Sequence, residues 1–484
     1  MWCVIILCYI ILLESVPCFA LSKLLIGFRP PSRNTWGFSD SSSYTLPHDE
    51  LLACLPTECA QLIPFTHCCQ STDQVWELKG VSKSEAVKAV KRAVLSHSLF
   101  EVLGASDSLD AALEAAATAA AVMIDARNDT LKKLGWFAAA TPSCGVDVEL
   151  QSLHPGNVEI CRRTELWKDT VMRKGARASQ NDVLIEIFDG MKLSSSPTVA
   201  LLYIMARRIA IGPAVDRGGA LASNLKRRRP RAGWLNTLAL HKRNGRCATS
   251  MEPEIAFLMA NLAAVSSSPS STPSLVLDPF AGSASILLAA AYIARFNGCC
   301  VKTFGVDAAA FVKQPDLKRD IKNDWTRLAL PPPLLVTGTI VEWSTWSFLN
   351  HASYDAIITD PPYAIKEEPL VYQLGTRKNK AAYNLDEIYR KDDVRSLYAA
   401  LFDLAASLLR ENGRLVVFVP EPFSNNTACD KRKEPELLGL TLPSPLKLIY
   451  ISRQRFRGGT FSRSLVVIKK SQEFKIEPSK DAIQ

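Results

Sequence analysis

The chain has 484 residues, of which 48% are hydrophobic and 22% are charged, and these fractions are close to those of an average globular protein. They exclude a disordered chain, a collagen-like chain and a protein with many membrane spans, and the length predicts more than one domain. The formal net charge of +9 is too small to indicate a nucleic-acid-binding protein unless the basic residues are concentrated in one place.

The first 21 residues differ from the rest of the chain. Residues 2–13 are hydrophobic without interruption, and Cys18-Phe19-Ala20 resembles a small-residue cleavage site. The run is too short to span a bilayer comfortably, so we expect no stable membrane span. No basic residue precedes it. Two interpretations remain open, a secretory or organellar targeting segment and an N-terminal extension that stays attached.

The 13 cysteines and six histidines show no spacing typical of metal ligands. No C-x-x-C motif occurs, and the pairs Cys68–Cys69 and Cys299–Cys300 are adjacent, which suits neither a zinc site nor an ordinary disulfide. We interpret the cysteines as reduced core residues and expect no metal site. The cytoplasm is therefore the expected compartment, and the N-terminal segment leaves an organelle or the secretory route as the alternative.

Residues 22–220 predict a mixed α and β domain without a recognisable catalytic motif. We expect strands at residues 23–28, 183–188, 199–205 and 209–211, helices at 50–55, 81–99 and 111–122, and a loop over 135–156. The helix at 111–122 is predicted because the segment is rich in alanine.

Residues 221–250 contain eight basic residues and no acidic one: Lys226, Arg227, Arg228, Arg229, Arg231, Lys242, Arg243 and Arg246. Subtracting these 8 from the 57 basic residues leaves 49 against 48 acidic ones, so almost the whole positive surplus lies in this segment. Such a run is either a solvated linker or, with an RNA or DNA partner, a strip of phosphate contacts.

From residue 252 onward strands alternate with helices, which predicts a mostly parallel sheet with ligands at the carboxyl ends of its strands. We expect helices at 252–264, 285–295 and 394–409, strands at 275–277, 303–306, 355–359 and 414–419 with a turn at Gly413, and an antiparallel pair formed by 446–452 and 464–469.

A turn containing glycine follows the first of these strands, with the sequence Asp278-Pro279-Phe280-Ala281-Gly282-Ser283-Ala284-Ser285. Glycine lets the backbone approach a ligand, and the helix that begins there presents free amide groups. Asp307, at the end of the next strand, is placed to accept hydrogen bonds from a ribose diol. The pattern fits a nucleotide site, and it also fits an ordinary strand-turn-helix junction.

A second motif, Thr359-Asp360-Pro361-Pro362-Tyr363, ends another strand. Two consecutive prolines can neither continue a sheet ladder nor enter a helix interior, so they fix a rigid extended exit from the strand. This is the most specific motif in the sequence.

The two motifs together resemble the amino-methylating class of AdoMet-dependent methyltransferases. Residues 242–245, 249–261 and 98–104 are similar to segments of the tRNA (guanine(10)-N2)-methyltransferase family. The resemblance is fullest over 242–363, extends to about 470 and is patchy before 209. It implies four parts: an α+β THUMP-related RNA-binding domain at 22–220, a basic linker at 221–248, a Rossmann-like seven-stranded AdoMet methyltransferase domain at 249–470, and a tail at 471–484.

The resemblance also implies roles for individual residues. Asp360 and the carbonyl of Pro361 would accept the two N–H groups of a guanine amine, Pro362 would complete the motif, and Tyr363 would stack on the extruded base. The AdoMet pocket would be lined by Thr249, Ser250, Met251, Asp278, Phe280, Gly282 and Asp307. Phosphate would be bound by Lys226, Arg227, Arg228, Arg229, Arg231, Lys242, Arg243, Arg377 and Lys378.

The implied function is AdoMet-dependent methylation of the exocyclic N2 of a guanine in tRNA, with a small zinc-binding activator subunit as partner. Two alternatives remain: methylation of adenine N6 or of rRNA guanine N2, and a catalytically inert RNA-binding or assembly factor. The chain departs from the family pattern at Ala284 and Ala364, where glycine is usual, and in Thr337-Gly338-Thr339, where an acidic residue is expected.

Overall fold

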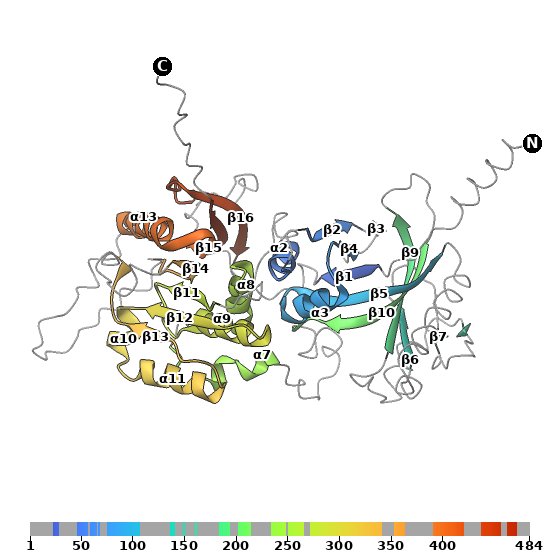
Figure 1. Cartoon of the computed structure of the whole chain (residues 1–484), viewed down its shortest axis with the longest axis horizontal. Coiled ribbons are helices and arrows are strands. Elements are labelled where there is room, and N and C mark those ends of the chain that lie inside the picture. The colour runs from blue at the N-terminus through green and yellow to red at the C-terminus, as the bar shows by residue number, and fades with distance from the viewer. Residues whose placement is uncertain are drawn as a thin grey trace, which may run out of the picture. The chain divides into compact units, whose positions relative to one another are not determined.

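The computed structural model describes residues 23–28, 46–56, 59–64, 66–67, 75–106, 136–140, 149–150, 160–161, 183–193, 202–213, 234–247, 250–265, 272–340, 353–363, 391–420, 437–455 and 462–471. The chain divides into two compact units, both visible in Figure 1. Unit 1 comprises residues 1–30, 57–91 and 96–215, and unit 2 comprises residues 31–56, 92–95 and 216–484.

Unit 1 is built on a sheet whose described strands follow the order β2-β4-β1-β5-β10-β9-β3, with β6 paired to β9. All pairs are antiparallel except β6 with β9. The elements are β1 (Leu24–Phe28), β2 (Gln61–Pro64), β3 (Thr66–His67), β4 (Val75–Lys79), α3 (Lys83–Arg92), β5 (Ser96–Ser106), β6 (Trp136–Ala140), β7 (Glu149–Leu150), β8 (Ile160–Cys161), β9 (Val183–Leu193) and β10 (Leu202–Ile211). This unit has mixed α and β structure, and its assignment as a THUMP-related domain stays a prediction.

Several expected elements of the first half differ from the structure. The helix predicted over 81–99 ends at Arg92, because residues 96–106 instead form β5, which pairs with β1 and β10. The loop predicted over 135–156 contains β6 and β7. The strands at 23–28 and 183–188 are confirmed, and the two predicted around 199–211 are one strand, β10. The helix predicted at 111–122 lies outside the described residues.

Unit 2 contains a seven-stranded sheet with the order β13-β12-β11-β14-β15-β17-β16. The five strands from β13 to β15 are parallel, and β17 runs antiparallel to both of its neighbours. Its strands are β11 (Ser274–Asp278), β12 (Val301–Val306), β13 (Leu334–Val336), β14 (Tyr354–Thr359), β15 (Leu409–Pro420), β16 (Leu446–Arg455) and β17 (Ser462–Lys470). This is the Rossmann-like, seven-stranded and mostly parallel sheet that the sequence predicts.

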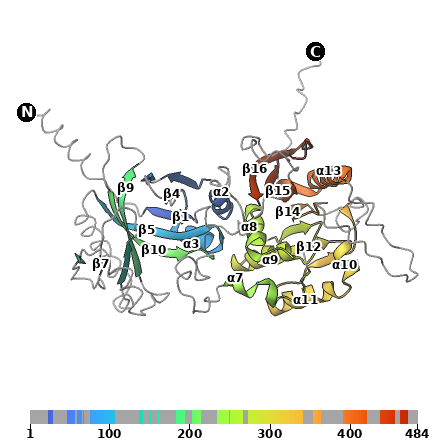
Figure 2. The same cartoon turned by 180° about the vertical axis from the view of Figure 1, so that it is seen from behind.

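Helices cover both faces of this sheet. Residues of α8, α9 and α11 pack in one hydrophobic cluster, and residues of α13 pack in a second cluster across the sheet. Figures 1 and 2 show α13 on the opposite side of the strands from α8 and α9. The helices are α2 (Leu46–Ala53), α7 (Trp234–Thr237), η5 (Leu240–Lys242), α8 (Pro253–Leu262), α9 (Ser285–Phe296), α10 (Ala309–Lys313), α11 (Leu317–Arg327) and α13 (Lys391–Leu408).

Burial on both faces explains why the central strands read as continuous hydrophobic runs instead of alternating ones. Residues 356–358 of β14 and 415–418 of β15 are fully buried. The turn predicted at Gly413 is wrong, because Gly413 lies inside β15, where the pairing with β14 is irregular. A Cβ on this glycine would lie 2.9 Å from the Arg410 carbonyl oxygen. The antiparallel pair at the C-terminal end is confirmed as β16 and β17.

A short segment from the first half of the chain belongs to unit 2. The carboxylate of Glu50, on α2, accepts hydrogen bonds from the Val94 and Leu95 amides, both at 2.8 Å. It also accepts one at 2.7 Å from Asn261 on α8, whose Oδ1 binds Arg92 at 2.9 Å. Burial raises the pKa of Glu50, these hydrogen bonds oppose the shift, and the resulting pKa is about 7. The helix predicted at 50–55 therefore begins earlier, at Leu46, and packs against α8.

Among the helices that the structure describes, none has both the length and the hydrophobicity needed to cross a membrane.

Candidate active site

The order of the strands reverses between β11 and β14, so the crevice at their carboxyl ends is the place where open α/β sheets bind ligands. Both sequence motifs follow these strands. Thr359, the last residue of β14, donates a hydrogen bond of 2.7 Å to Oδ1 of Asp278, the last residue of β11. One buried contact therefore joins two motifs that lie 81 residues apart.

Asp278 is the buried centre of the first motif, with 1% of its surface exposed. Its Oδ1 also accepts a hydrogen bond of 3.1 Å from the amide of Phe280. The pKa of Asp278 is raised to about 7, mainly by burial; the two hydrogen bonds oppose this shift, and the nearby charges of Asp307 and Asp360 add to it. Asp278 thus stabilises the turn through hydrogen bonds inside the protein. In this it differs from a carboxylate that is exposed and binds a ligand directly.

Asp307 attaches the glycine turn to the end of β12. Its Oδ2 accepts a hydrogen bond of 2.8 Å from the Gly282 amide, and its Oδ1 accepts one of 2.7 Å from the Ala310 amide. Burial raises its pKa, and these backbone hydrogen bonds lower it. A carboxylate has about four lone-pair sites, so Asp307 keeps acceptor capacity for a ligand.

Gly282 has a φ of +48°, and a Cβ placed on it would meet nothing within 4 Å. The backbone of this turn therefore borders open space at Gly282, whose amide donates to Asp307. A bare backbone edge beside a carboxylate and a helix start fits a nucleoside such as that of AdoMet. Phe280, half-buried, packs against the α13 cluster at the same turn.

Ala284, where the family pattern has glycine, is fully buried and precedes α9 with a φ of 56°. This left-handed conformation is disfavoured for residues with a Cβ by about 1–2 kcal/mol. The fold thus retains the backbone geometry that suits glycine, although the residue is alanine. Ala364, the other departure, lies outside the described residues.

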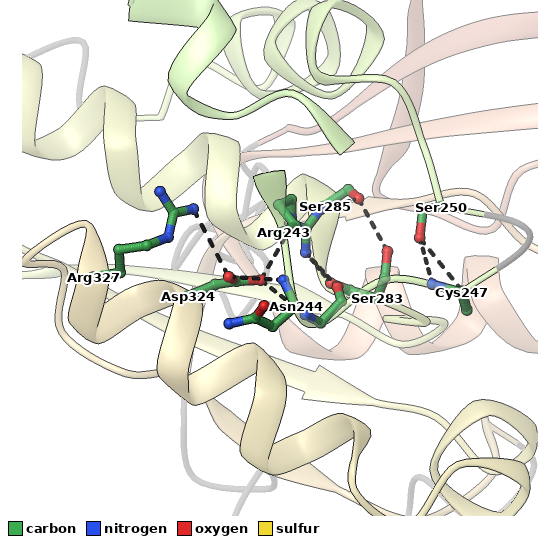
Figure 3. A network of polar contacts seen from close by, with 9 residues as sticks. Arg243, Asn244, Cys247, Ser250, Ser283, Ser285, Asp324 and Arg327 are labelled. Carbon is green, nitrogen blue, oxygen red and sulfur yellow. Dashed lines mark hydrogen bonds and ion pairs between the residues drawn. The ribbon is translucent and has the colours of Figure 1, made fainter. Parts of the chain in front are cut away.

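A buried arginine contacts the same turn, as Figure 3 shows. Arg243 donates from Nη1 to the Ser285 hydroxyl at 2.6 Å and from Nη2 to the carbonyl oxygens of Ser283 and Gly245. Its Nε lies 3.7 Å from Oδ2 of Asp324 on α11. The guanidinium therefore joins the cofactor turn to the segment around residue 245.

Asp324 completes this network from α11. Its carboxylate accepts the amides of Asn244 at 3.1 Å and Gly245 at 2.9 Å, and Arg327 lies 3.8 Å away. Gly245 is required here, because a Cβ on it would lie 2.7 Å from the backbone of Ile321. The turn at 243–245 is therefore tightly bound to α11.

These contacts correct the expectation that Arg243 binds phosphate. Its side chain is 1% exposed and its donors point to protein acceptors, so it does not present its charge at the surface. Lys242, next to it, is exposed at the end of η5 and stays compatible with a phosphate contact. The other predicted phosphate-binding residues lie outside the described residues: Lys226, Arg227, Arg228, Arg229, Arg231, Arg377 and Lys378.

The remaining predicted cofactor residues lie just before α8. The Ser250 hydroxyl accepts a hydrogen bond of 2.8 Å from the Cys247 amide, and Met251 packs against the α8 and α9 cluster. Thr249 lies outside the described residues. The structure therefore brings Asp278, Gly282 and Asp307 together and leaves the part played by residues 249–251 a prediction.

The second motif leaves β14 at Asp360, whose side chain is 24% exposed. Pro361 is buried, and Pro362 and Tyr363 are half-buried. Arg463 on β17 donates from Nη1 to both carboxylate oxygens of Asp360, at 2.9 and 3.1 Å, and to the Tyr363 hydroxyl at 2.6 Å. Burial raises the pKa of Asp360, and the Arg463 charge and hydrogen bond lower it.

Sequence reasoning did not identify Arg463. The only signal was a basic residue at the start of an otherwise hydrophobic strand, and such residues are common at strand ends. No spacing rule relates it to Asp360, because the pairing of β17 with β15 decides which residues of β17 face the motif. Within the described residues, no group of three histidine, cysteine, aspartate or glutamate side chains is arranged to hold a metal ion.

Comparisons with known proteins relate this chain to RNA methyltransferases. It is 30% identical over 183 residues to tRNA (guanine(10)-N(2))-methyltransferase TRMT11 of Dictyostelium discoideum, covering 36% of this chain and 33% of that protein. It is 27% identical over 257 residues to the Xenopus laevis protein of the same name, covering 50% and 49%. The chain thus spans between a third and a half of the length of these curated relatives.

No protein-family model matches the chain. Among solved structures, the rRNA methyltransferase aviRa of Streptomyces viridochromogenes is 15% identical, with a TM-score of 0.28 and coverage of 47% of this chain and 92% of that one; a score this low adds nothing to the fold described above. The resemblance that the sequence motifs indicate is nevertheless confirmed, since this chain is similar to curated tRNA (guanine(10)-N(2))-methyltransferases over about half of its length.

Proposed function

We propose that this chain is an AdoMet-dependent methyltransferase that modifies the exocyclic N2 amine of a guanine in tRNA. The observation that carries the proposal is the meeting of the two motifs at the switch point of a methyltransferase sheet, where Thr359 hydrogen-bonds Asp278. The similarity to relatives named tRNA (guanine(10)-N(2))-methyltransferase supports guanine and tRNA over adenine or rRNA.

The proposed chemistry depends on positioning. A guanine N2 amine is a poor nucleophile, because its lone pair is delocalised into the ring. The Asp360 carboxylate and the Pro361 carbonyl would accept its two N–H groups and turn the lone pair toward the methyl donor. Tyr363 would pack against the base after it leaves the stack. Aligning two reactants can lower a barrier by roughly 7 kcal/mol or more.

AdoMet fits the first motif. When bound, it supplies an electrophilic methyl group on a sulfonium. Asp307 would accept hydrogen bonds from its ribose, and the Gly282 backbone would allow close approach. Ser250, Met251 and Phe280 would flank it, with Thr249 beside them. Asp278 would act indirectly, because its hydrogen bonds fix the position of the turn relative to the catalytic motif.

We further propose that unit 1 captures structured RNA as a THUMP-related domain and that the basic segment from Lys226 to Arg231, with Lys242, Arg377 and Lys378, binds phosphate. A zinc-binding activator subunit is kept as a proposed partner. The cytoplasm is the proposed compartment, on the ground that the spacing of the cysteines in the sequence suits neither a disulfide framework nor a metal site.

The proposal is tested by incubating the protein, with and without a small zinc-binding activator, with labelled AdoMet and unmodified tRNA. The expected product is N2-methylguanosine. Identification of N6-methyladenosine would refute the guanine assignment, and the lack of any product under both conditions would refute the enzymatic function. Asp360→Ala should abolish transfer and leave AdoMet affinity within about threefold of wild type, since Asp360 contacts the acceptor side only. A collapse of cofactor affinity would contradict its assigned role.

The basic segment is tested by replacing Arg227, Arg228 and Arg229 with glutamine. Each phosphate contact contributes roughly 0.7–0.9 to the slope of log K against log salt. Losing three should weaken tRNA binding and lower the slope by about 2–3. A matched control replaces Lys318, Arg319 and Lys322 on α11. Unchanged affinity and slope in the glutamine variant would show that the segment is only a linker, and an equal loss of slope in the α11 variant would show that its phosphate contacts are not specific to this segment.

A further inference from the structure

The Arg463 side chain lies at the centre of the catalytic motif, although it comes from β17, about 100 residues further along the chain. It is 8% exposed. One terminal nitrogen, Nη1, contacts three oxygens: the two carboxylate oxygens of Asp360 and the hydroxyl of Tyr363. The two side chains expected to hold the target base are therefore held by the same cation.

The guanidinium is itself fixed in orientation. Its Nε donates a hydrogen bond of 2.7 Å to Oε1 of Gln454 on β16. Its Cζ lies 3.6 Å from the centre of the Phe418 ring on β15. A planar group with one face against an aromatic ring and one edge on an amide cannot rotate freely. The remaining edge of the guanidinium, which carries Nη1, therefore points at Asp360 and Tyr363.

We propose that Arg463 is a positioning residue for methyl transfer, which fixes the Asp360 carboxylate and the Tyr363 ring in the geometry that receives the guanine amine. This inference rests on the function proposed above, because it assigns Arg463 a role in that reaction. Arg463 acts through Asp360 and Tyr363 and is not itself expected to contact the reacting atoms. An ionised carboxylate bound to one donor keeps further lone pairs, so Asp360 can still accept an N–H.

The charge of Arg463 has a second consequence. Asp360 must be ionised to act only as an acceptor, and burial opposes ionisation. The charged and titratable groups around Asp360 are Arg463 on β17, Tyr363 in its own motif, Asp278 at the end of β11 and Tyr398 on α13. Arg463 is the cation of this set that contacts Asp360, and its charge and hydrogen bond lower the pKa of that carboxyl.

Removing Arg463 therefore changes both geometry and protonation. In Arg463→Met we expect kcat to fall by about 10- to 100-fold, the range for loss of a hydrogen bond to a charged group. Because activity is lost as pH falls through the Asp360 pKa, the acidic limb of the kcat profile should move to higher pH. AdoMet affinity should stay near wild type. Arg463→Lys keeps the charge but loses the Gln454 contact, so it should restore the pH profile while kcat stays reduced.

The experiment measures kcat against pH for wild type, Arg463→Met and Arg463→Lys, together with the Asp360 pKa by carboxyl-carbon NMR, assigned with Asp360→Asn. The control is Arg414→Met on β15, where the arginine donates to the Leu262 carbonyl at 2.8 Å; it should leave both readouts unchanged. Circular dichroism and AdoMet titration confirm that each variant is folded.

Each outcome is decisive for one of the two proposals. A raised Asp360 pKa with a shifted, slower profile in Arg463→Met supports the inference. An Asp360 pKa that is unchanged in folded Arg463→Met overturns it, whatever the activity, and so does a kcat equal to that of Arg414→Met. A wild-type protein that methylates no RNA refutes the proposed function, and the positioning role for Arg463 falls with it.

Discussion

Replacing Asp278 with asparagine removes a buried negative charge and keeps the oxygen that its neighbours use. Thr359 and the Phe280 amide both donate to Oδ1, and an asparagine side chain offers an equivalent carbonyl oxygen. The substitution therefore separates the effect of the buried charge on the free energy of unfolding from the effect of the hydrogen bonds. Asp278→Asn should fold with the same turn.

The expected magnitude follows from the pKa of Asp278, which burial raises from 3.8 to about 7. Between these values the folded protein holds a proton that the unfolded chain releases, so the wild-type free energy of unfolding decreases as pH rises through this window. Three pH units at about 1.4 kcal/mol each correspond to about 4 kcal/mol. Asp278→Asn lacks this loss, so it should be more stable than wild type by up to about 4 kcal/mol at pH 8 and equal to it near pH 4.

The assay is urea unfolding at pH 4, 6 and 8, followed by tryptophan fluorescence, since Trp325 lies buried in the same unit. The matched control is Asp403→Asn, which makes the same substitution at an exposed position on α13 and should change the free energy of unfolding by less than about 0.5 kcal/mol. The reasoning is refuted if Asp278→Asn is less stable than wild type at pH 8, or if its stability difference is the same at all three pH values.

Two further substitutions test the support of the cofactor turn. Ala284→Gly should stabilise the protein by about 0.5–1 kcal/mol in urea unfolding, because relief of the positive φ of 56° outweighs the lost methyl group and the freer unfolded chain. Its control, Ala289→Gly inside α9, should destabilise the protein by about 1 kcal/mol or more. A loss of stability in both variants would contradict the strain assigned to Ala284. Asp324→Ala should cost about 3–5 kcal/mol and weaken AdoMet binding measured by calorimetry, because Arg243 is left buried without its carboxylate. Asp316→Ala, whose partner Arg319 is on the surface, should change stability by less than about 0.5 kcal/mol, and equal effects would remove the special role of Asp324.

The sequence predicted the parts of the fold that local rules govern. The end of β14 was predicted because the two consecutive prolines Pro361 and Pro362 cannot continue a sheet ladder, and the end of β11 was predicted from the glycine turn that follows it. The helix at 285–295 was predicted by its hydrophobic residues and the glycine turn before it. Where local propensity conflicted with pairing, prediction failed: residues 96–99 continue a helical pattern, yet they form β5 because β1 and β10 pair with them on both sides.

The residues that sequence reasoning misplaced are those whose partners are far along the chain. Arg243 stands in a run of basic residues, so composition assigns it to the surface. Its acceptors include Ser283 and Ser285, about 40 residues later, and its ion-pair partner Asp324 lies about 80 residues later. The sequence contains these residues, but only the packing of α11 and α9 on one face of the sheet brings them together. For the same reason Glu50 contacts Asn261 across 211 residues.

Two buried arginines hold the two halves of the candidate site. Arg243 binds the turn that begins α9, and Arg463 binds the motif that leaves β14, while the Thr359–Asp278 hydrogen bond joins the two strand ends. Both arginines are buried and paired with aspartates, so neither contributes to a phosphate-binding surface. A reaction that depends on alignment requires both loops to stay fixed relative to each other. The loss of either arginine should therefore lower the rate without removing a reacting group, and this distinguishes their effect from that of Asp360→Ala.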